Sequence, residues 1–248
     1  TDAWPYPVKV YTLGRFEALI NDRMLESSGK TQKKPLQMLK MLVAMGPEGV
    51  PDKELTDTLW PDADGDLAQQ SFNTTLHRLR KLLKNEKTVL LSDGKISLNR
   101  RYVWADVWSF EAMNYWAREN LPDKADHLQN ALKIYKGRFL PMDAMETWVI
   151  SKQEKLDYLF LNLIMALGNA YEREERLEKA IDVYQRGIEA NDTAEEFYQR
   201  LMFCLSRIGQ RTKAMMVYNQ CRSRLASKLD IGPSAATESI YAQMLGKD

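Results

Sequence analysis

The chain has 248 residues, which favours two domains, and 44% of them are hydrophobic and 28% charged, with a formal net charge of +1. This composition excludes a disordered or fibrous chain, and no apolar run approaches the ~18 residues needed to cross a bilayer. The only cysteines, Cys204 and Cys221, argue against a disulfide framework, so we expect a protein of the reducing cytoplasm without membrane contact.

The charge is distributed unevenly along the chain. Residues 1–105 carry 16 Lys and Arg against 13 Asp and Glu, whereas residues 106–248 carry 19 against 21. Between Arg78 and Arg101 the net charge is +6, and between Glu48 and Asp66 it is −6. The cationic segment suits a polyanion and the acidic segment would repel one, although two solvated faces would give the same pattern.

The chain is predicted to begin with strands that lead into a helix. Residues 8–13 and 15–20 alternate in side-chain character around Gly14, which predicts short antiparallel strands. Apolar residues then recur at helical spacing and predict a first helix over residues 34–45, with Gly46 at its exit. A small β-sheet and a helix therefore open the first domain.

Two further helices follow the first. Residues 52–59 are predicted to form a short helix that ends before Pro61, and residues 61–66 form a turn-rich acidic loop. The third helix is predicted over residues 67–84. On a helical wheel of ~100° per residue its buried side is a narrow apolar stripe. This stripe consists of Phe72, Leu76, Leu79 and Leu83.

The opposite side of the third helix carries amide, hydroxyl, imidazole and cationic groups, which can reach base edges and phosphates in a DNA major groove. These residues are Gln70, Asn73, Thr74, His77, Arg78 and Lys81. Residues 88–91 and 95–98 are then predicted to be strands joined at Asp93-Gly94, a strong hairpin signal. Strands, three helices and a basic hairpin in this order indicate a winged helix-turn-helix, whose third helix enters the major groove.

The candidate DNA-binding residues divide by chemistry. Arg78 and Asn73 are predicted to read bases, because Arg pairs with guanine and Asn with adenine through two hydrogen bonds, although intrahelical ion pairing is an alternative for them. Thr74 and His77 lie on the same face, and His77 is equally well explained as a surface residue. Phosphate contacts, which position a domain without reading sequence, are predicted for Arg80, Lys81, Lys84, Lys95 and Arg101, and Lys33 and Lys34 are weaker candidates.

The second half of the chain is almost entirely helical in character and contains an internal repeat. Leu167, Ala180 and Tyr184, shifted by 34 residues, land on Leu201, Ala214 and Tyr218. This is the tetratricopeptide period, whose units bury their faces only by stacking. The sequence therefore predicts a mainly α protein, with a winged helix and small β-sheet in residues 1–105 and a tetratricopeptide-like all-α domain in residues 106–248.

The chain also resembles a known family in both halves. Leu13-Gly14, residues 34–45, Leu55 through Leu59-Trp60-Pro61 and residues 76–83 resemble the DNA-binding half of the antibiotic regulatory proteins of actinomycetes, transcription activators whose winged helix is similar to that of response regulators. The second half resembles the bacterial transcriptional activation domain. The residues that carry this resemblance are Asp106 with Phe110, residues 135–140, Glu146 with Trp148, Leu201-Met202, Tyr218 with Arg222 and Leu225, and residues 229–234.

This resemblance implies a cytoplasmic activator that binds repeats in double-stranded promoter DNA with residues 67–84 and the wing at 88–98. It also implies that the acidic loop, with Asp62, Asp64 and Asp66, meets RNA polymerase, although a plain solvated turn explains these residues equally well. A homodimer on direct repeats fits the same picture. Because the first residue is Thr1 rather than Met, we allow for a sensor region upstream.

No pattern typical of catalysis or metal binding is found in the sequence. Gly29-Lys30-Thr31 copies the end of a phosphate-binding loop, but the glycine required five positions earlier is Met24. The two histidines lie far from the two cysteines, so metal-ligand spacing is lacking. We therefore expect neither an enzyme nor a cofactor. The alternatives are a repeat-based adaptor that binds proteins but not DNA, and an enzyme with an unmarked carboxylate site.

Overall fold

A computed structural model describes residues 6–25, 32–116 and 124–246 of the chain, so Gly29-Lys30-Thr31 lies outside the described residues. The chain forms two compact units, one of residues 1–112 and 134–156 and the other of residues 113–133 and 157–248. The expected fold class is confirmed, because helices dominate and the strands gather near the N-terminus. None of the described helices is both long and apolar enough to cross a membrane.

The first unit contains a four-stranded sheet, with three strands from residues 8–24 and one from residues 103–105. Its strands are β1 (Val8–Tyr11), β2 (Glu17–Ile20), β3 (Arg23–Met24) and β7 (Val103–Ala105), in the order β3-β2-β1-β7. The predicted strands around Gly14 are confirmed and pair antiparallel, with Val8 opposite Ile20. Gly14 has φ +83°, and a Cβ there would lie 2.7 Å from the carbonyl oxygen of Lys136, so this turn requires glycine.

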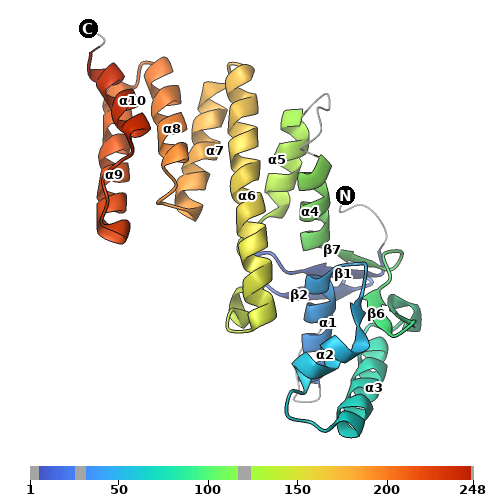
Figure 1. The fold of residues 1–248 in the computed structure, drawn as a ribbon. Coiled ribbons are helices and arrows are strands. Elements are labelled where there is room, and N and C mark those ends of the chain that lie inside the picture. Colours follow the sequence, from blue (N-terminus) through green and yellow to red (C-terminus); the bar gives the residue numbers. More distant parts are fainter. Residues whose placement is uncertain (1–5, 26–31, 117–123, 247–248) are drawn as a thin grey trace. The chain divides into compact units, whose positions relative to one another are not determined.

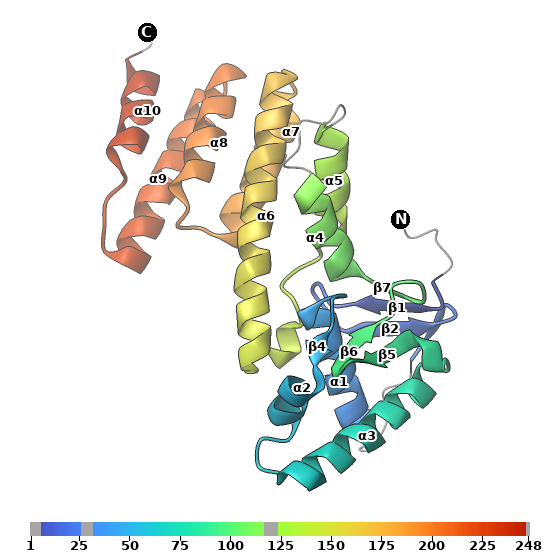
Figure 2. The same ribbon diagram turned by 45° about the vertical axis from the view of Figure 1, so that its right-hand side comes forward.

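Three helices of the first unit follow the predicted ranges to within two residues. They are α1 (Lys33–Met45), α2 (Asp52–Leu59) and α3 (Gly65–Leu82). In both views α1 lies between the sheet and α3 (Figure 1, Figure 2), and it packs against α3. The core that they enclose is apolar and almost fully buried; it includes Met38, Leu39, Leu42, Leu55, Leu59, Phe72 and Leu79.

The predicted hairpin after α3 is confirmed as a wing. A 3-10 turn, η2 (Glu86–Thr88), leads into β5 (Val89–Ser92), which pairs antiparallel with β6 (Lys95–Leu98). Asp93 and Gly94 have φ of +53° and +70°, the left-handed geometry that suits a two-residue hairpin turn. The sequence did not indicate a third strand, β4 (Val50–Pro51), which pairs with β6. Together these elements form a winged helix-turn-helix.

Residues after β7 complete the first unit. The helix α4 (Asp106–Trp116) begins directly after β7, and the indole nitrogen of Trp108 donates a hydrogen bond of 2.9 Å to the carbonyl of Val43 in α1. Further along the chain, after α5 (Lys124–Ile134), Phe139 forms a β-bridge with Leu13. A 3-10 turn, η3 (Pro141–Asp143), follows it. Residues 134–156 are therefore part of the same core as β1.

The carboxylate of Asp106 is the buried polar centre of this unit. It accepts hydrogen bonds of 2.7 to 2.9 Å from the backbone nitrogens of Thr12, Leu13 and Val107 and from the hydroxyl of Thr12. Asp106 is 3% exposed, and its burial raises its pKa above the ordinary value although these hydrogen bonds act in the opposite direction. One side chain thus joins the end of β1 to the start of α4.

The second unit is a stack of antiparallel helices. The helix α6 (Thr147–Arg173) begins in the first unit and ends in the second, and it is followed by α7 (Leu177–Ala190), α8 (Glu195–Arg207), α9 (Arg211–Leu229) and α10 (Ala235–Leu245). Figure 1 shows α7, α8 and α9 side by side in chain order. The predicted repeat positions are at most 5% exposed: Leu167, Ala180, Tyr184, Leu201, Ala214 and Tyr218. The tetratricopeptide-like prediction is therefore confirmed.

Gly168 lies where α6 closely approaches Tyr184 of α7, and its replacement gives a first prediction. A Cβ at Gly168 would overlap the ring of Tyr184, whose hydroxyl is held by Glu172 and Asn169 and so cannot move freely. We expect Gly168→Ala to lower the free energy of unfolding by about 1 kcal/mol or more. Urea unfolding followed by circular dichroism measures this change.

Gly65→Ala is the matched control, because Gly65 also lies in a helix but has open space around its Cβ position. The control should leave the free energy of unfolding unchanged or raise it slightly. Equal urea midpoints for the two variants would contradict the proposed contact between Gly168 and Tyr184.

Candidate nucleic-acid interface

The helix α3 has one buried and one solvent-exposed side, as its sequence pattern predicts. Phe72, Leu76 and Leu79 are at most 3% exposed, and they pack inside the first unit. The opposite side is exposed along the length of the helix; it carries Gln70, Asn73, Thr74, His77, Arg78 and Lys81. The predicted orientation of α3 is therefore confirmed, and a row of hydrogen-bonding and cationic groups faces outward.

The two base-reading candidates are available for an external partner. Among the residues that the structure describes, neither Asn73 nor Arg78 has a hydrogen-bond or ion-pair partner on its side chain. The intrahelical ion pair considered as an alternative for Arg78 is thus not formed within these residues. Thr74 and His77 share the exposed face with them. Their contacts with bases stay a prediction.

Arg80 has a role within the fold that its sequence position did not reveal. Its guanidinium donates hydrogen bonds of 2.9 and 3.3 Å to the carbonyl of Val89, the first residue of β5. Arg80 therefore fixes α3 against the wing. Its predicted phosphate contact is untested.

Lys34 likewise makes an internal contact. Its ammonium donates a 2.6 Å hydrogen bond to the carbonyl of Leu59 and lies 5.6 Å from the centre of the Trp60 ring. A cation at the last carbonyls of a helix is favoured by the helix dipole. Lys34 thus joins α1 to the end of α2, which accounts for this residue without DNA.

The remaining phosphate-binding candidates lie around the wing and the end of α3. Lys84 follows α3 in a left-handed conformation with φ +55°, and Lys95 lies at the start of β6 opposite Ser92. Arg101 lies in the turn before β7, where its backbone nitrogen donates to Asn99. The side chains of Lys84, Lys95 and Arg101 are exposed. The cationic candidates therefore lie at the end of α3, on the wing and in the turn that follows the wing.

The acidic loop lies at the other end of α3. Asp62 and Asp64 are exposed in the connection between α2 and α3, and Asp66 is exposed in the first turn of α3. Carboxylates are favoured at a helix N-terminus and cations at its C-terminus, so the helix dipole explains part of this arrangement. An 18-residue helix spans about 27 Å, which separates the acidic end of α3 from its cationic end.

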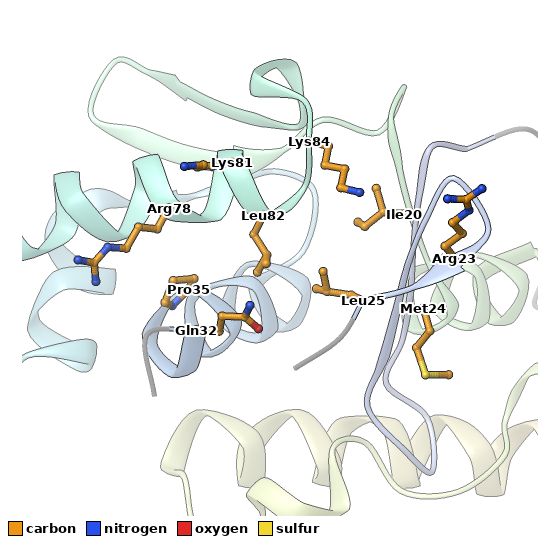
Figure 3. Close-up of a pocket in the computed structure, with 10 residues that line it drawn as sticks. All are labelled: Ile20, Arg23, Met24, Leu25, Gln32, Pro35, Arg78, Lys81, Leu82 and Lys84. Atoms are coloured by element: carbon orange, nitrogen blue, oxygen red, sulfur yellow. The ribbon is translucent and has the colours of Figure 1, made fainter. Parts of the chain in front are cut away.

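A pocket of about 750 Å³ lies between the C-terminal half of α3, the β2–β3 hairpin and the start of α1 (Figure 3). Three predicted DNA-binding residues line it, namely Arg78, Lys81 and Lys84. A fourth cation, Arg23, comes from the hairpin and was missed by the sequence analysis. Its isolated position in the chain gave no signal, because only the folded sheet places it near α3. Ile20, Leu25, Pro35 and Leu82 provide apolar contacts between these charges.

Comparisons with known proteins agree with this architecture. The family model of the bacterial transcriptional activator domain matches residues 105–245. Among solved structures, EmbR of Mycobacterium tuberculosis, in complex with a low-affinity phosphopeptide, is similar with a TM-score of 0.75 and 18% sequence identity. The similarity covers 96% of this chain and 65% of the EmbR chain, and at this identity it establishes the fold alone. A comparison with curated protein sequences finds no significant match.

Proposed function

Since the chain belongs to the bacterial transcriptional activator domain family, as its resemblance to the antibiotic regulatory proteins indicates, we propose that it binds promoter DNA sequence-specifically and activates transcription. Proteins of this family regulate transcription. In this function α3 enters the major groove of double-stranded DNA, and the wing contacts the backbone or the minor groove. The observation that carries it is the exposed amide-bearing and cationic side of α3, opposite a fully buried apolar stripe.

In this arrangement the side chains of α3 have two kinds of role. Arg78 and Asn73 read base edges, and Thr74 and His77 contact the same part of the groove. Phosphates are bound by cations of α3, the wing and the following turn, which position the unit without reading sequence. These cations are Arg80, Lys81, Lys84, Lys95 and Arg101.

The acidic loop and the second unit have protein partners in this proposal. Asp62, Asp64 and Asp66 lie at the N-terminal end of α3, away from its cationic end, so DNA can contact the exposed side of α3 while RNA polymerase contacts the acidic loop. The stacked helices of the second unit dock with a partner or join two protomers on direct promoter repeats. The protein acts in the cytoplasm, where promoter DNA and RNA polymerase are found.

A selection experiment tests the proposal without knowledge of the target promoter. The full chain is incubated with a random pool of DNA duplexes, the bound duplexes are enriched and sequenced, and the affinity for the enriched site is measured between 50 and 200 mM salt. We expect a repeated sequence motif and an affinity that falls steeply with salt, because binding releases counterions from the phosphates.

The adaptor alternative makes the opposite prediction. A chain that binds only proteins through its stacked helices would enrich no motif and retain no duplex even at 50 mM salt. That result would overturn the proposed function.

A further inference from the structure

Four cations line the pocket beside α3. They are Arg23, Arg78, Lys81 and Lys84, and no acidic side chain is among the described lining residues of the pocket. None of these four cations has an ion-pair or hydrogen-bond partner among the described residues. The pocket therefore collects positive charge that the described part of the fold does not balance.

Several other cations of the first unit pair with carboxylates. Lys9 and Lys40 lie 2.7 Å from Asp22 and Asp143, and Lys152 lies 2.9 Å from Glu111. The contact between Lys9 and Asp22 matters here, because Asp22 precedes Arg23 in the chain. Among the described residues the carboxylate of Asp22 pairs with Lys9 and forms no ion pair with Arg23. The cations of the pocket, which have no such partner among the described residues, thus differ from Lys9, Lys40 and Lys152.

The arrangement of these cations favours an extended anion. Figure 3 shows Arg78 and Lys81 on α3, at one side of the pocket, and Arg23 on the hairpin at the other side, while Lys84 extends toward Ile20 between them. The charges do not converge on one point, as they would around a single small ion. A row of phosphates, such as a nucleic acid strand carries, matches charges that are spread along a trough.

The pocket also lies on the side of α3 that faces away from the wing. At ~100° per residue, Arg80 and Leu82 point to opposite sides of the helix. Arg80 is bonded to Val89 of the wing, whereas Leu82 lines the pocket. A duplex lying on the exposed side of α3 would therefore have the wing along one flank and the pocket along the other.

From these observations we infer that the pocket is a phosphate-binding trough, in which Arg23 of the β2–β3 hairpin, together with Lys84, holds the DNA backbone on the flank of α3 opposite the wing. The inference rests on the proposed function and adds a second, unanticipated backbone contact to it. Arg23 acts as a positioning residue, because a phosphate contact carries no base information.

Arg23→Gln tests this role in the full chain, with a fluorescently labelled random-sequence duplex as the probe. One lost phosphate contact should lower the slope of log affinity against log salt by about 0.9. The affinity lost between 50 and 200 mM salt should then be roughly threefold smaller than for the wild type. Arg23→Lys retains the charge and should retain the slope, and circular dichroism verifies that both variants are folded.

Lys136→Gln is the matched control. Lys136 is exposed and belongs to the same unit, but it adjoins Gly14 at the β1–β2 turn, whereas Arg23 lies in the hairpin at the other end of β2. Its removal should leave the slope unchanged. An unchanged slope for Arg23→Gln, or an equal decrease for both glutamine variants, would overturn the inference.

Calorimetric titration with tripolyphosphate distinguishes DNA from a free phosphorylated ligand. If tripolyphosphate binds the wild type but not Arg23→Gln, while both bind duplex with the same slope, the trough holds a free ligand and the assignment to DNA is wrong. If the wild type binds no duplex at all, the proposed function fails first and this inference with it. If duplex binding is retained and only the effect of Arg23 is missing, this inference alone fails.

Discussion

Replacing Arg78 with alanine is expected to weaken binding to the specific DNA site by about 1 to 3 kcal/mol, or roughly 5- to 150-fold, and to relax the base preference at one position. The expectation follows from the exposed guanidinium on the outward side of α3, which has no partner among the described residues. Because Arg78 is exposed, its truncation should leave the free energy of unfolding nearly unchanged. Competition binding with duplexes that differ at one base pair measures the preference.

Lys95→Ala is the comparison that separates base reading from charge. Lys95 lies on the wing, where we expect a phosphate contact, so its loss should weaken binding to all duplexes alike and lower the salt slope by about 1. The Arg78 variant instead changes the ranking of the duplexes. If both variants bind the selected site as the wild type does, the docking of α3 and the wing on DNA is wrong.

The recognition helix and the wing could be predicted from short stretches of sequence. The spacing of Phe72, Leu76 and Leu79 shows which side of α3 is buried, because side chains of an α-helix return to the same side about every 3.6 residues and the apolar side must face the core. Asp93-Gly94 fixes the hairpin for a similar reason, since few residue pairs adopt the left-handed turn. Exposure of the DNA-binding candidates followed from these two local facts.

Contacts between distant segments could not be predicted in the same way. Spacing shows that Arg80 and Lys34 are polar positions on helices, but it does not show that the carbonyls of Val89 and Leu59 lie within their reach. The place of Arg23 beside α3 depends on the pairing of β2 with β3 and on the packing of α1. Such neighbours are determined by the whole fold. They decide which cations form contacts within the protein and which remain available to bind DNA.

The organisation of the first unit shows the same dependence on distant segments. The family model begins at residue 105, yet residues 106–112 and 134–156 belong to the compact unit that contains the winged helix. Leu13 pairs with Phe139, and Val43 accepts the indole hydrogen of Trp108. The boundary between residues 105 and 106 stays a prediction, but the winged helix depends on residues that follow it.

Asp106 is the residue after position 105 on which the winged helix is expected to depend most. Its replacement by alanine is expected to lower the free energy of unfolding by at least about 3 kcal/mol. The carboxylate is 3% exposed and accepts hydrogen bonds from four donors on Thr12, Leu13 and Val107. Alanine leaves these buried donors without a partner, and each unsatisfied group costs about 1 to 3 kcal/mol before water reaches it. Because a whole domain is stabilised by only about 5 to 15 kcal/mol, the loss is severe.

Urea unfolding followed by tryptophan fluorescence measures this loss, and hydrogen exchange locates it, with the amides of β1 and β2 expected to exchange faster in Asp106→Ala. Asp106→Asn retains one acceptor oxygen and should fall between the wild type and the alanine variant. Asp22→Ala is the matched control, because the Asp22 carboxylate is 77% exposed in its ion pair with Lys9 and such pairs contribute at most about 1 kcal/mol. If Asp106→Ala unfolds at the same urea concentration as Asp22→Ala, β1 and α4 are held together by packing rather than by this carboxylate.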